Sequence, residues 1–420
     1  MKKIKSVCPK CNKWIEAKII YQKNKVFMIK KCPIHGNFKN LIDSDKSFYK
    51  STQNQENKKL RHSRLEIPVT YNCNLKCSFC YAPNNKKKDL SIKEISKIID
   101  KFDGDYISIS GGEPTLRNDL PQIIKLIINK NKIPILNTNG IRLADENYVK
   151  ILKKAGLRLI HFSFNGFKND PFINQNVKNI IKLKQKALKN IINEKILIIL
   201  SLLLLKGENE SELKPIIKYA LKNDKSIFEL RIRSANMIGR YKNTTVYTTS
   251  EILNLVCKTL NINKKHLINK LKQIKKGKCS CKFSGTFYFM NKISKFLDVK
   301  LYPRTGKENL FSFISKYGNI FLIDLIKKLN LNQMYYYYSF FQINNKAKKN
   351  ILKAIIGHKK IKALRIEIRS WPNKYNVNLN ETSNCPSLGL SKNKKELLPF
   401  CYRFFTEKKF KNKEVSLCKY

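Results

Sequence analysis

The sequence contains no apolar run long enough to span a bilayer. Its most apolar stretch, residues 196–205, reads ILIILSLLLL and is bounded on both sides by lysine. Because a transmembrane helix needs about 20 apolar residues, this stretch is predicted to be a buried parallel strand. The start, MKKIKSVCPKC, meets cysteine before any apolar run and so differs from a signal peptide. We therefore expect a cytoplasmic protein.

Acidic residues are also scarce. The 420 residues include 85 Lys and Arg against 30 Asp and Glu, a formal net charge of +55. Such an excess is typical of nucleic-acid-binding proteins, but here lysine is spread along the whole chain. It accompanies frequent Ile and Asn, which a biased codon supply also produces, so we expect no specific nucleic-acid partner. Attraction to acidic partners follows in either case, including peripheral association with an anionic membrane.

Cysteine, by contrast, is abundant and grouped. The twelve cysteines comprise three near the amino terminus, a triplet at residues 73–80, and six after residue 256. In a protein expected in the cytoplasm, closely spaced cysteines indicate metal ligands rather than disulfides.

From residue 64 onward, strand-like and helix-like segments alternate. This rhythm predicts βα units around a parallel sheet, and six units fit an open, partial (β/α)6 TIM-like barrel of the α/β class. Functional residues in such sheets lie at the carboxyl ends of the strands. The expected strands are Leu65–Thr70, Tyr106–Ser110, Ile133–Thr138, Arg158–Ser163, Lys195–Leu205 and Ile227–Ile232.

The flanking regions break this rhythm. We expect a small metal-knuckle domain at residues 1–45, a polar connector at 46–63, the barrel core at 64–240 and a mixed C-terminal domain at 241–420. Helices are expected between the strands, one of them capped by Ser91 with Glu94 as its capping-box partner, and another capped by Asp119. Beyond the core, only Ser250–Lys275 is predicted to be helical.

The cysteine triplet directly follows the first expected strand. Residues 70–81 read TYNCNLKCSFCY and place Cys73, Cys77 and Cys80 in a C-x3-C-x2-C spacing. A cubane iron–sulfur cluster has four irons and normally takes four thiolates. Three thiolates leave one iron open to chelate an amine and a carboxylate, as the methionyl end of S-adenosylmethionine (SAM) offers. A zinc site and a chance grouping are the alternatives.

A second motif, Ser110-Gly-Gly-Glu-Pro114, follows the second expected strand. With the triplet it makes the chain resemble the radical SAM superfamily from about residue 64 to residue 240. The resemblance implies a [4Fe-4S] cluster on the three cysteines and a partial-barrel fold. It also implies that the glycines admit a close approach to SAM, whose ammonium the backbone and carboxylate hold.

The same resemblance implies further contacts to SAM at the ends of the third and fourth strands. Asn139 lies in the segment NTNG, and Ser163 and Asn165 lie in SFNG, although both segments also fit ordinary turn chemistry. The SAM-binding residues that the resemblance implies are Phe79, Gly111, Gly112, Glu113, Pro114, Asn139, Ser163 and Asn165.

The amino-terminal cysteines have the spacing of a metal site. The segments CPKC and CPIHG form C-x2-C-x20-C-x2-H, in which two knuckles each supply two ligands. Trp14–Ile20 and Lys25–Ile29 read as strands between them, so a zinc ribbon and a rubredoxin-like iron site both fit. Three thiolates and one imidazole favour zinc, with unligated cysteines as the alternative. The expected ligands are Cys8, Cys11, Cys32 and His35.

The later cysteines predict an auxiliary [4Fe-4S] cluster, with single structural cysteines as the alternative. Its candidate ligands are Cys279, Cys281, Cys385 and Cys401, whereas Cys257 lies on an expected helix and fits a core position.

Taken together, the chain resembles one branch of the superfamily, the archaeal tetraether lipid synthases and methyltransferase-like proteins proposed to act on pterins. It shares the CPxC…CPxHG knuckle, the stretches Gly207–Leu213 and Ile232–Arg240, and a late cysteine followed by Pro-Phe-Cys. Those relatives often carry an extra cysteine-rich segment just before the core, but residues 46–72 contain no cysteine. One auxiliary cluster of that branch is therefore not matched here.

These features predict a radical SAM enzyme that forms a C–C or C–S bond or adds a methyl group, with lipid substrates first and pterins second. One alternative is a peptide-modifying maturase, although no motif regular in Gly and Cys is found near the C-terminus. Another is a zinc-ribbon nucleic-acid-binding protein, which would not cleave SAM. The expected partners are a small-molecule or lipid substrate and an electron donor such as ferredoxin or flavodoxin.

No residue is assigned as a general acid or base. His161 and His266 are expected to be structural or solvent-facing, and Glu229, Arg231 and Arg233 to face the barrel interior.

Overall fold

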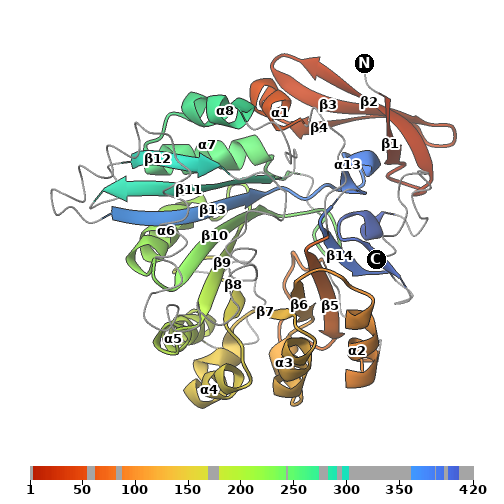
Figure 1. Ribbon diagram of the computed structural model, residues 1–420. Coiled ribbons are helices and arrows are strands. Elements are labelled where there is room, and N and C mark those ends of the chain that lie inside the picture. The colour runs from red at the N-terminus through yellow and green to blue at the C-terminus, as the bar shows by residue number, and fades with distance from the viewer. Residues whose placement is uncertain are drawn as a thin grey trace.

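The computed structural model describes ten segments of the chain and contains two sheets. The described segments are residues 3–53, 62–81, 88–168, 179–242, 245–273, 282–290, 296–301, 361–383, 385–391 and 396–405. A four-stranded antiparallel sheet forms the amino-terminal part, and the remaining described strands belong to one eleven-stranded sheet (Figure 1).

The centre of the large sheet consists of six strands that pair in chain order, each parallel to the next. Each corresponds to one strand of the predicted partial barrel, so the predicted fold class is confirmed. The strands are β5 (Arg64–Thr70), β6 (Tyr106–Gly111), β7 (Ile133–Thr138), β8 (Leu159–Ser163), β9 (Leu197–Leu204) and β10 (Ile227–Ser234).

Helices connect these strands and cover the outer face of the sheet (Figure 1). They are α2 (Ile92–Asp100), α3 (Leu120–Asn129), α4 (Glu146–Lys154), α5 (Ile180–Asn193) and α6 (Leu213–Lys222). The predicted capping box of Ser91 and Glu94 is present. Asp119 does not cap α3 with its side chain, because its carboxylate is held by the Arg117 guanidinium at 2.5 and 2.7 Å.

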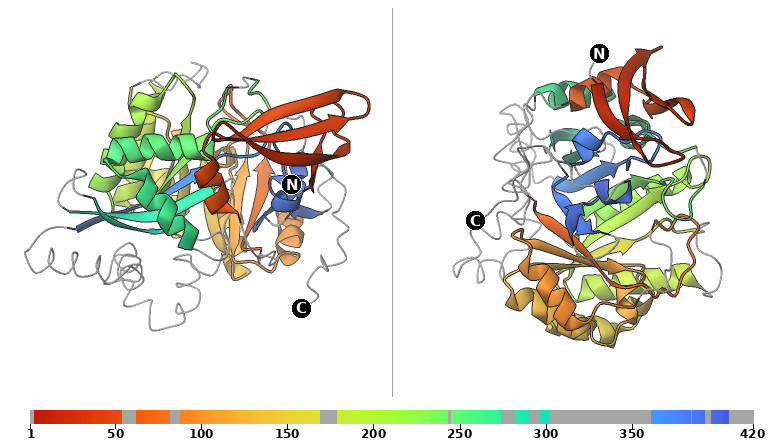
Figure 2. Two further views of the ribbon diagram at one scale, coloured as in Figure 1. Left: turned by 90° about the horizontal axis from the view of Figure 1, so that it is seen from above. Right: turned by 90° about the vertical axis from the view of Figure 1, so that its right-hand side faces the viewer.

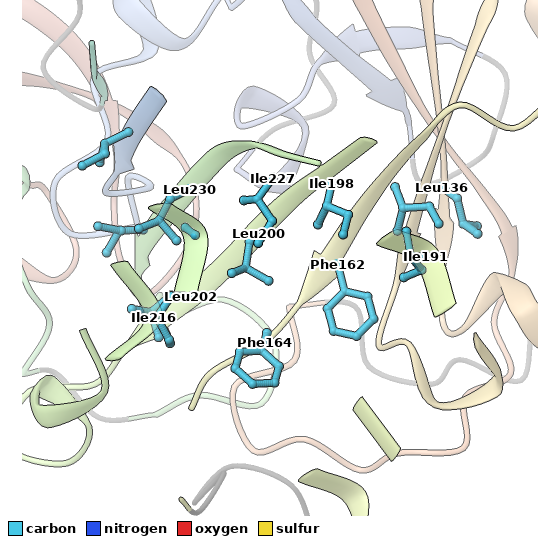
Figure 3. Packing of buried hydrophobic residues seen from close by; sticks show 14 of the residues in the cluster. Leu136, Phe162, Phe164, Ile191, Ile198, Leu200, Leu202, Ile216, Ile227 and Leu230 are labelled. Atoms are coloured by element: carbon cyan, nitrogen blue, oxygen red, sulfur yellow. The ribbon is translucent and has the colours of Figure 1, made fainter. Parts of the chain in front are cut away.

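The largest hydrophobic cluster lies between the outer face of the sheet and these helices. It includes Phe162 and Phe164 near β8, Leu200 and Leu202 on β9, and Ile216 on α6 (Figure 3). The inner face has a different pattern along the strands. A small apolar cluster fills it near the amino ends, and polar residues such as Ser108, Asn137 and His161 follow toward the carboxyl ends. The apolar cluster consists of Tyr106, Ile135, Leu159, Leu197, Ile199 and Phe228.

C-terminal segments extend the sheet at both edges. Beyond β10 lie β13 (Ile361–Arg369), β11 (Lys282–Met290) and β12 (Phe296–Leu301). Beyond β5 lie β14 (Ser387–Leu390) and β15 (Leu397–Pro399), so no pairing closes the described strands into a barrel. The strands after residue 240 are therefore continuous with the core sheet.

The predicted helix at Ser250–Lys275 is two helices, α7 (Thr249–Leu260) and α8 (Lys264–Gln273). The chain turns between them at Asn261, whose φ of 53° is left-handed and ends α7. Cys257 is buried in the core on α7, as expected.

The amino-terminal sheet contains β1 (Lys3–Val7), β2 (Trp14–Gln22), β3 (Lys25–Cys32) and β4 (Gly36–Asp43), and short α1 (Lys46–Thr52) follows. This sheet packs on C-terminal segments, including α13 (Leu379–Thr382), at one end of the large sheet (Figure 2). Val7 shares a buried cluster with Val377 and Tyr402, and Ser6 Oγ donates to the Val377 carbonyl at 2.7 Å.

Candidate functional site

A cavity of about 220 Å³ lies at the carboxyl ends of the parallel strands. The loops after β5, β6 and β7 form one wall, and residues of β10 and β13 form another. Its lining residues include most of those predicted to bind the cluster and SAM. The predicted residues that line the cavity are Cys73, Cys77, Phe79, Cys80, Gly111, Gly112, Glu113, Asn139 and Ser163.

The cysteine loop is held by backbone contacts from distant segments. The segment after β10 touches it directly, since the Arg240 N–H donates to the Cys80 carbonyl at 2.9 Å. Gly239, with φ of 75°, lies so close that a Cβ there would meet that carbonyl oxygen at 2.2 Å. The three thiols are half-buried and form no disulfide. The loop therefore presents three thiols to the cavity from a fixed backbone.

The two glycines of the second motif pack against this loop. A Cβ on Gly111 would lie 2.0 Å from the Thr70 carbonyl oxygen, and one on Gly112 would lie 2.0 Å from that of Asn72. The Gly112 and Glu113 N–H groups donate to these same carbonyls at 2.8 and 2.7 Å. The structure thus gives these glycines a role in addition to the expected approach to a ligand: they bring two loops together, and both line the cavity.

Glu113 is a buried carboxylate at the centre of the cavity wall. It accepts hydrogen bonds from the Thr115 hydroxyl, the Thr138 hydroxyl and the Asn139 N–H, each at 2.7 Å. Burial raises the pKa of Glu113, although these hydrogen bonds oppose the effect. Among the described residues no cationic side chain pairs with it, so a cationic ligand group in the cavity would complete the site.

The remaining predicted SAM-binding residues divide into two groups. Asn139 lines the cavity and donates to Asn74 Oδ1 at 2.8 Å, and Ser163 and Phe79 also line it. Pro114 is buried at the start of a short 3-10 helix and lies outside the lining set. Asn165 also lies outside it, because its amide oxygen accepts from the Leu203 N–H at 3.1 Å and links β8 to β9.

Several residues of the cavity were not predicted as site residues. Arg64 and Arg369 line it, as do the rings of Tyr81, Trp371 and Phe400, which make edge-to-face contacts with centroids 5.3–6.1 Å apart. For Arg369 and Trp371 the sequence carries no local signal, since they reach the cavity only through the pairing of β13 with β10.

The histidine and charged residues of the inner face also reach this region. His161 lines the cavity and contacts Asn137 Oδ1 through Nδ1 at 3.1 Å, whereas His266 lies exposed on α8. Burial, and then the charges of Arg231 and Arg233, hold the pKa of His161 well below its usual value. Arg231 and Arg233 line the cavity, and Glu229 lies buried beside them.

The four predicted knuckle ligands come together. The ligand atoms of Cys8, Cys11, Cys32 and His35 all lie within 4.8 Å of one another. The knuckles end at left-handed positions, Asn12 with φ of 57° and Gly36 with φ of 74°. Burial alone would raise the pKa of Cys8, but backbone N–H groups of Cys11 and Lys10 outweigh it and lower that pKa to about 6. The set fits one tetrahedral metal ion.

The predicted auxiliary cluster is less well defined. Cys385 is buried before β14 and Cys401 follows β15, so the hairpin that joins these strands brings both cysteines to its open end. Cys279 and Cys281 lie outside the described residues. The auxiliary cluster remains a prediction.

Comparison with known families agrees with this geometry. The radical SAM superfamily matches residues 67–220, and the HMPTM N-terminal zinc ribbon domain matches residues 1–44. The 7,8-dihydro-6-hydroxymethylpterin dimethyltransferase of Methanocaldococcus jannaschii is 31% identical over 281 residues, 58% of this chain and 55% of that protein. The GTP 3′,8-cyclase of Aquifex aeolicus is 29% identical over 214 residues, 46% of this chain and 64% of the cyclase.

The chain thus spans between about half and two thirds of the length of these relatives. Among solved structures, SuiB of Streptococcus suis bound to SAM is 19% identical, with a TM-score of 0.40, over 51% of this chain and 48% of SuiB. That likeness is too slight to bear on the site.

Residues 67–220 thus form a radical SAM domain. The zinc ribbon and the dimethyltransferase relative support the pterin methyltransferase-like branch, so the predicted resemblance is confirmed. A radical SAM domain implies a [4Fe-4S] cluster and SAM, and three thiols beside a buried carboxylate without a cation among the described residues fit both. No helix in the described segments has the length and apolar character needed to cross a membrane.

Proposed function

We propose that the protein cleaves SAM reductively at a [4Fe-4S] cluster held by Cys73, Cys77 and Cys80. When bound, cluster and SAM together supply a 5′-deoxyadenosyl radical, which removes hydrogen from an unactivated carbon. The observation that carries this proposal is the pairing of three half-buried thiols with the buried carboxylate of Glu113 in one cavity.

The residues around the cavity would have different roles in binding the cluster and SAM. The three cysteines hold the cluster, and Glu113 receives the ammonium of SAM while Asn139 fixes that carboxylate through its N–H. Phe79 packs against the apolar residues Leu203 and Leu205 and shields the thiol loop from water. A shielded site favours the intended hydrogen transfer over side reactions of a radical.

For the substrate we propose a pterin or a related polar heterocycle, modified by methylation or C–C bond formation. Two observations support a pterin over the lipid that the sequence resemblance ranked first. One is the similarity to the pterin dimethyltransferase. The other is that Arg64, Arg233 and Asn236 line the cavity, since a lipid chain would leave these polar side chains without partners whereas a polar heterocycle can bind them.

The proposal also includes the domain bounds and the electron donor. We assign residues 1–45 as the zinc ribbon, 64–240 as the radical SAM core, and 241–420 as the C-terminal part. A low-potential donor such as ferredoxin or flavodoxin supplies the electron. The Cys3His set favours zinc over a redox iron, because an imidazole stands where a rubredoxin-like iron site has its fourth thiolate.

Anaerobic reconstitution with iron and sulfide tests the proposal. The protein is given dithionite and SAM, and 5′-deoxyadenosine is quantified with and without 7,8-dihydro-6-hydroxymethylpterin or an archaeal lipid extract. We expect 5′-deoxyadenosine in all three samples and a product of higher mass only with the pterin. A modified lipid would instead favour the lipid substrate that the resemblance ranked first. If a protein with a full cluster forms no 5′-deoxyadenosine, the proposal is contradicted and the nucleic-acid-binding alternative is favoured.

A further inference from the structure

Charges on the neighbouring strands β10 and β13 pair in three successive rungs. The first two rungs join opposite charges, but the third, nearest the carboxyl ends, joins two arginines. Like charges side by side destabilise a sheet unless a counter-charge lies beside them. The rungs are Glu229 with Arg365, Arg231 with Glu367, and Arg233 with Arg369.

The two carboxylates of this ladder are fully engaged by the lower rungs and their neighbours. Glu229 contacts Arg231 at 2.6 Å and Arg365 at 3.0 Å. Glu367 contacts Arg231 at 2.8 Å, and it also receives Lys282 at 2.6 Å and Arg369 at 2.5 Å. Neither carboxylate is shared with Arg233, so the third rung keeps uncompensated positive charge.

Arg233 itself faces the cavity. Its Nε is buried and has no hydrogen-bond partner among the described residues, and its guanidinium lies 5.9 Å from the centroid of Trp371. The nearby Arg64 donates only to neutral atoms, Ser108 Oγ at 2.7 Å and Asn137 Oδ1 at 3.4 Å. Two arginines at the cavity thus have no anionic partner in the part of the chain that is described.

The same imbalance extends over the cavity lining and the charged residues beside it. In the described segments, seven cationic side chains there face four carboxylates, and the carboxylate of Glu66 is already bound by the Tyr81 hydroxyl at 2.9 Å. Water solvates buried and half-buried cations incompletely, so a counter-charge stabilises them. The cations are Arg64, Arg231, Arg233, Lys282, Arg365, Arg369 and Arg403, and the carboxylates are Glu66, Glu113, Glu229 and Glu367.

We infer that the substrate carries an anionic group, a phosphate or a carboxylate, which binds Arg233 with Arg64 and Arg369 beside it. Planar guanidinium groups bind such oxyanions in a bidentate manner. This inference rests on the proposed function, since it concerns the substrate of the same cavity. It requires that a pterin with a phosphate or carboxylate substituent binds more tightly than the uncharged 7,8-dihydro-6-hydroxymethylpterin. Two buried acceptors nearby, His161 Nε2 and Asn236 Oδ1, also have no partner among the described residues. They would receive N–H or O–H groups of the same molecule.

The SAM carboxylate is the other source of an anion, and position separates the two. The residues that fit the SAM ammonium follow β6 and β7, whereas Arg233 and Arg369 lie on β10 and β13. Three strands, β7, β8 and β9, lie between β6 and β10 in the sheet. The anion at Arg233 is therefore assigned to the substrate.

Binding of inorganic pyrophosphate to the reconstituted full-length protein tests this inference, by isothermal titration calorimetry. We expect Arg233→Gln to weaken pyrophosphate binding by about tenfold or more, since a buried charge partner is lost. Arg233→Lys keeps the charge but not the bidentate contact, so it should weaken binding less than Arg233→Gln. The matched control is Arg158→Gln, which removes an exposed arginine far from the cavity and should leave pyrophosphate binding unchanged.

SAM affinity and 5′-deoxyadenosine formation are measured on the same samples. A loss of pyrophosphate binding that exceeds any loss of SAM affinity supports the substrate anion. An equal or larger loss of SAM affinity would assign Arg233 to the SAM carboxylate and overturn the inference, as would failure of the wild-type protein to bind pyrophosphate at millimolar concentration. Formation of 5′-deoxyadenosine reports SAM cleavage independently of pyrophosphate binding. A failure of this inference and a failure of the proposed function therefore give different results.

Discussion

The chain has two cysteine sites that differ in whether their ligand set is closed. In the amino-terminal knuckle, three thiols and one imidazole lie within 4.8 Å of one another and fill a tetrahedron. In the loop after β5, three half-buried thiols line a cavity that also contains Glu113. A closed set holds a metal for stability, whereas an incomplete set leaves a position for a ligand.

The local electrostatics act on the thiols of both sites. Backbone N–H groups lower the pKa of Cys8 to about 6 despite its burial. The Lys13 N–H opposes the effect at Cys11, but burial and the neighbouring Cys8 and Cys32 raise its pKa. Burial raises the pKa of Cys73, and the Glu113 charge adds to this effect. The two sites therefore differ in their ligand sets, and the predictions below separate them.

The largest effect is expected at the open site. Cys77→Ala should abolish 5′-deoxyadenosine formation, because two thiolates of one loop no longer hold the cluster. Iron content and 5′-deoxyadenosine are measured after anaerobic reconstitution. Cys257→Ala, which removes a core thiol outside both sites, is the control and should retain both quantities. Cleavage of SAM by the Cys77 variant would show that this cysteine is not a cluster ligand.

Removal of a ligand from the closed site should leave SAM cleavage largely intact. Structural zinc contributes on the order of 10 kcal/mol to the folding of small domains, so Cys11→Ala should lose its zinc and unfold the ribbon. Zinc content by mass spectrometry and proteolysis within residues 3–43 report the change. If cluster iron disappears together with zinc, the two sites are coupled and the comparison fails.

A methyl group added near each site should distinguish them as well. Gly112→Ala places a Cβ 2.0 Å from the Asn72 carbonyl oxygen and should cost about 3 kcal/mol of stability by forcing the loops apart. Gly36→Ala meets no atom within 4 Å, so only its left-handed backbone opposes the change, at about 1 kcal/mol. Chemical denaturation measures both, and equal losses would contradict the close packing at Gly112.

Glu113→Gln tests the carboxylate of the open site. The variant keeps the side-chain volume but loses the charge that would pair with the SAM ammonium. Hydrogen bonds to charged groups contribute about 2 kcal/mol, which corresponds to a fall of SAM affinity by roughly thirtyfold. Equilibrium dialysis with labelled SAM measures the affinity, and zinc content should stay unchanged. Unaltered SAM binding would remove Glu113 from the site.

The smallest effect concerns pH. Because the pKa of His161 is held well below its usual value, the unfolded chain takes up a proton near pH 6.5 while the folded protein does not. The stability linked to His161 is complete above that pH and is lost as the pH falls, by about 1.4 kcal/mol for each unit. His161→Gln should therefore flatten the decline below pH 6.5 in denaturation curves, and a decline as steep as that of the wild-type protein would contradict this assignment.

The sequence predicts the parts of the fold that depend on local patterns. The six core strands are short segments rich in Ile and Leu that alternate with helix-like segments, and the cysteine spacings are short and local, so both can be recognised without the structure. Long-range pairing is different. Nothing near Arg369 indicates that β13 will pair with β10, and the rung of Arg233 and Arg369 exists only in that register. The role of Gly112 likewise depends on Asn72, a residue of another loop.

The central claim is that the loop after β5 leaves one iron open to SAM. Electron paramagnetic resonance of the reduced cluster tests it most directly, with Cys11→Ala used as the background so that the knuckle cannot contribute iron. The account predicts that addition of SAM shifts the g values of the cluster, because SAM becomes a ligand. A spectrum that stays unchanged with saturating SAM would mean that all four irons are already occupied, and would contradict the account.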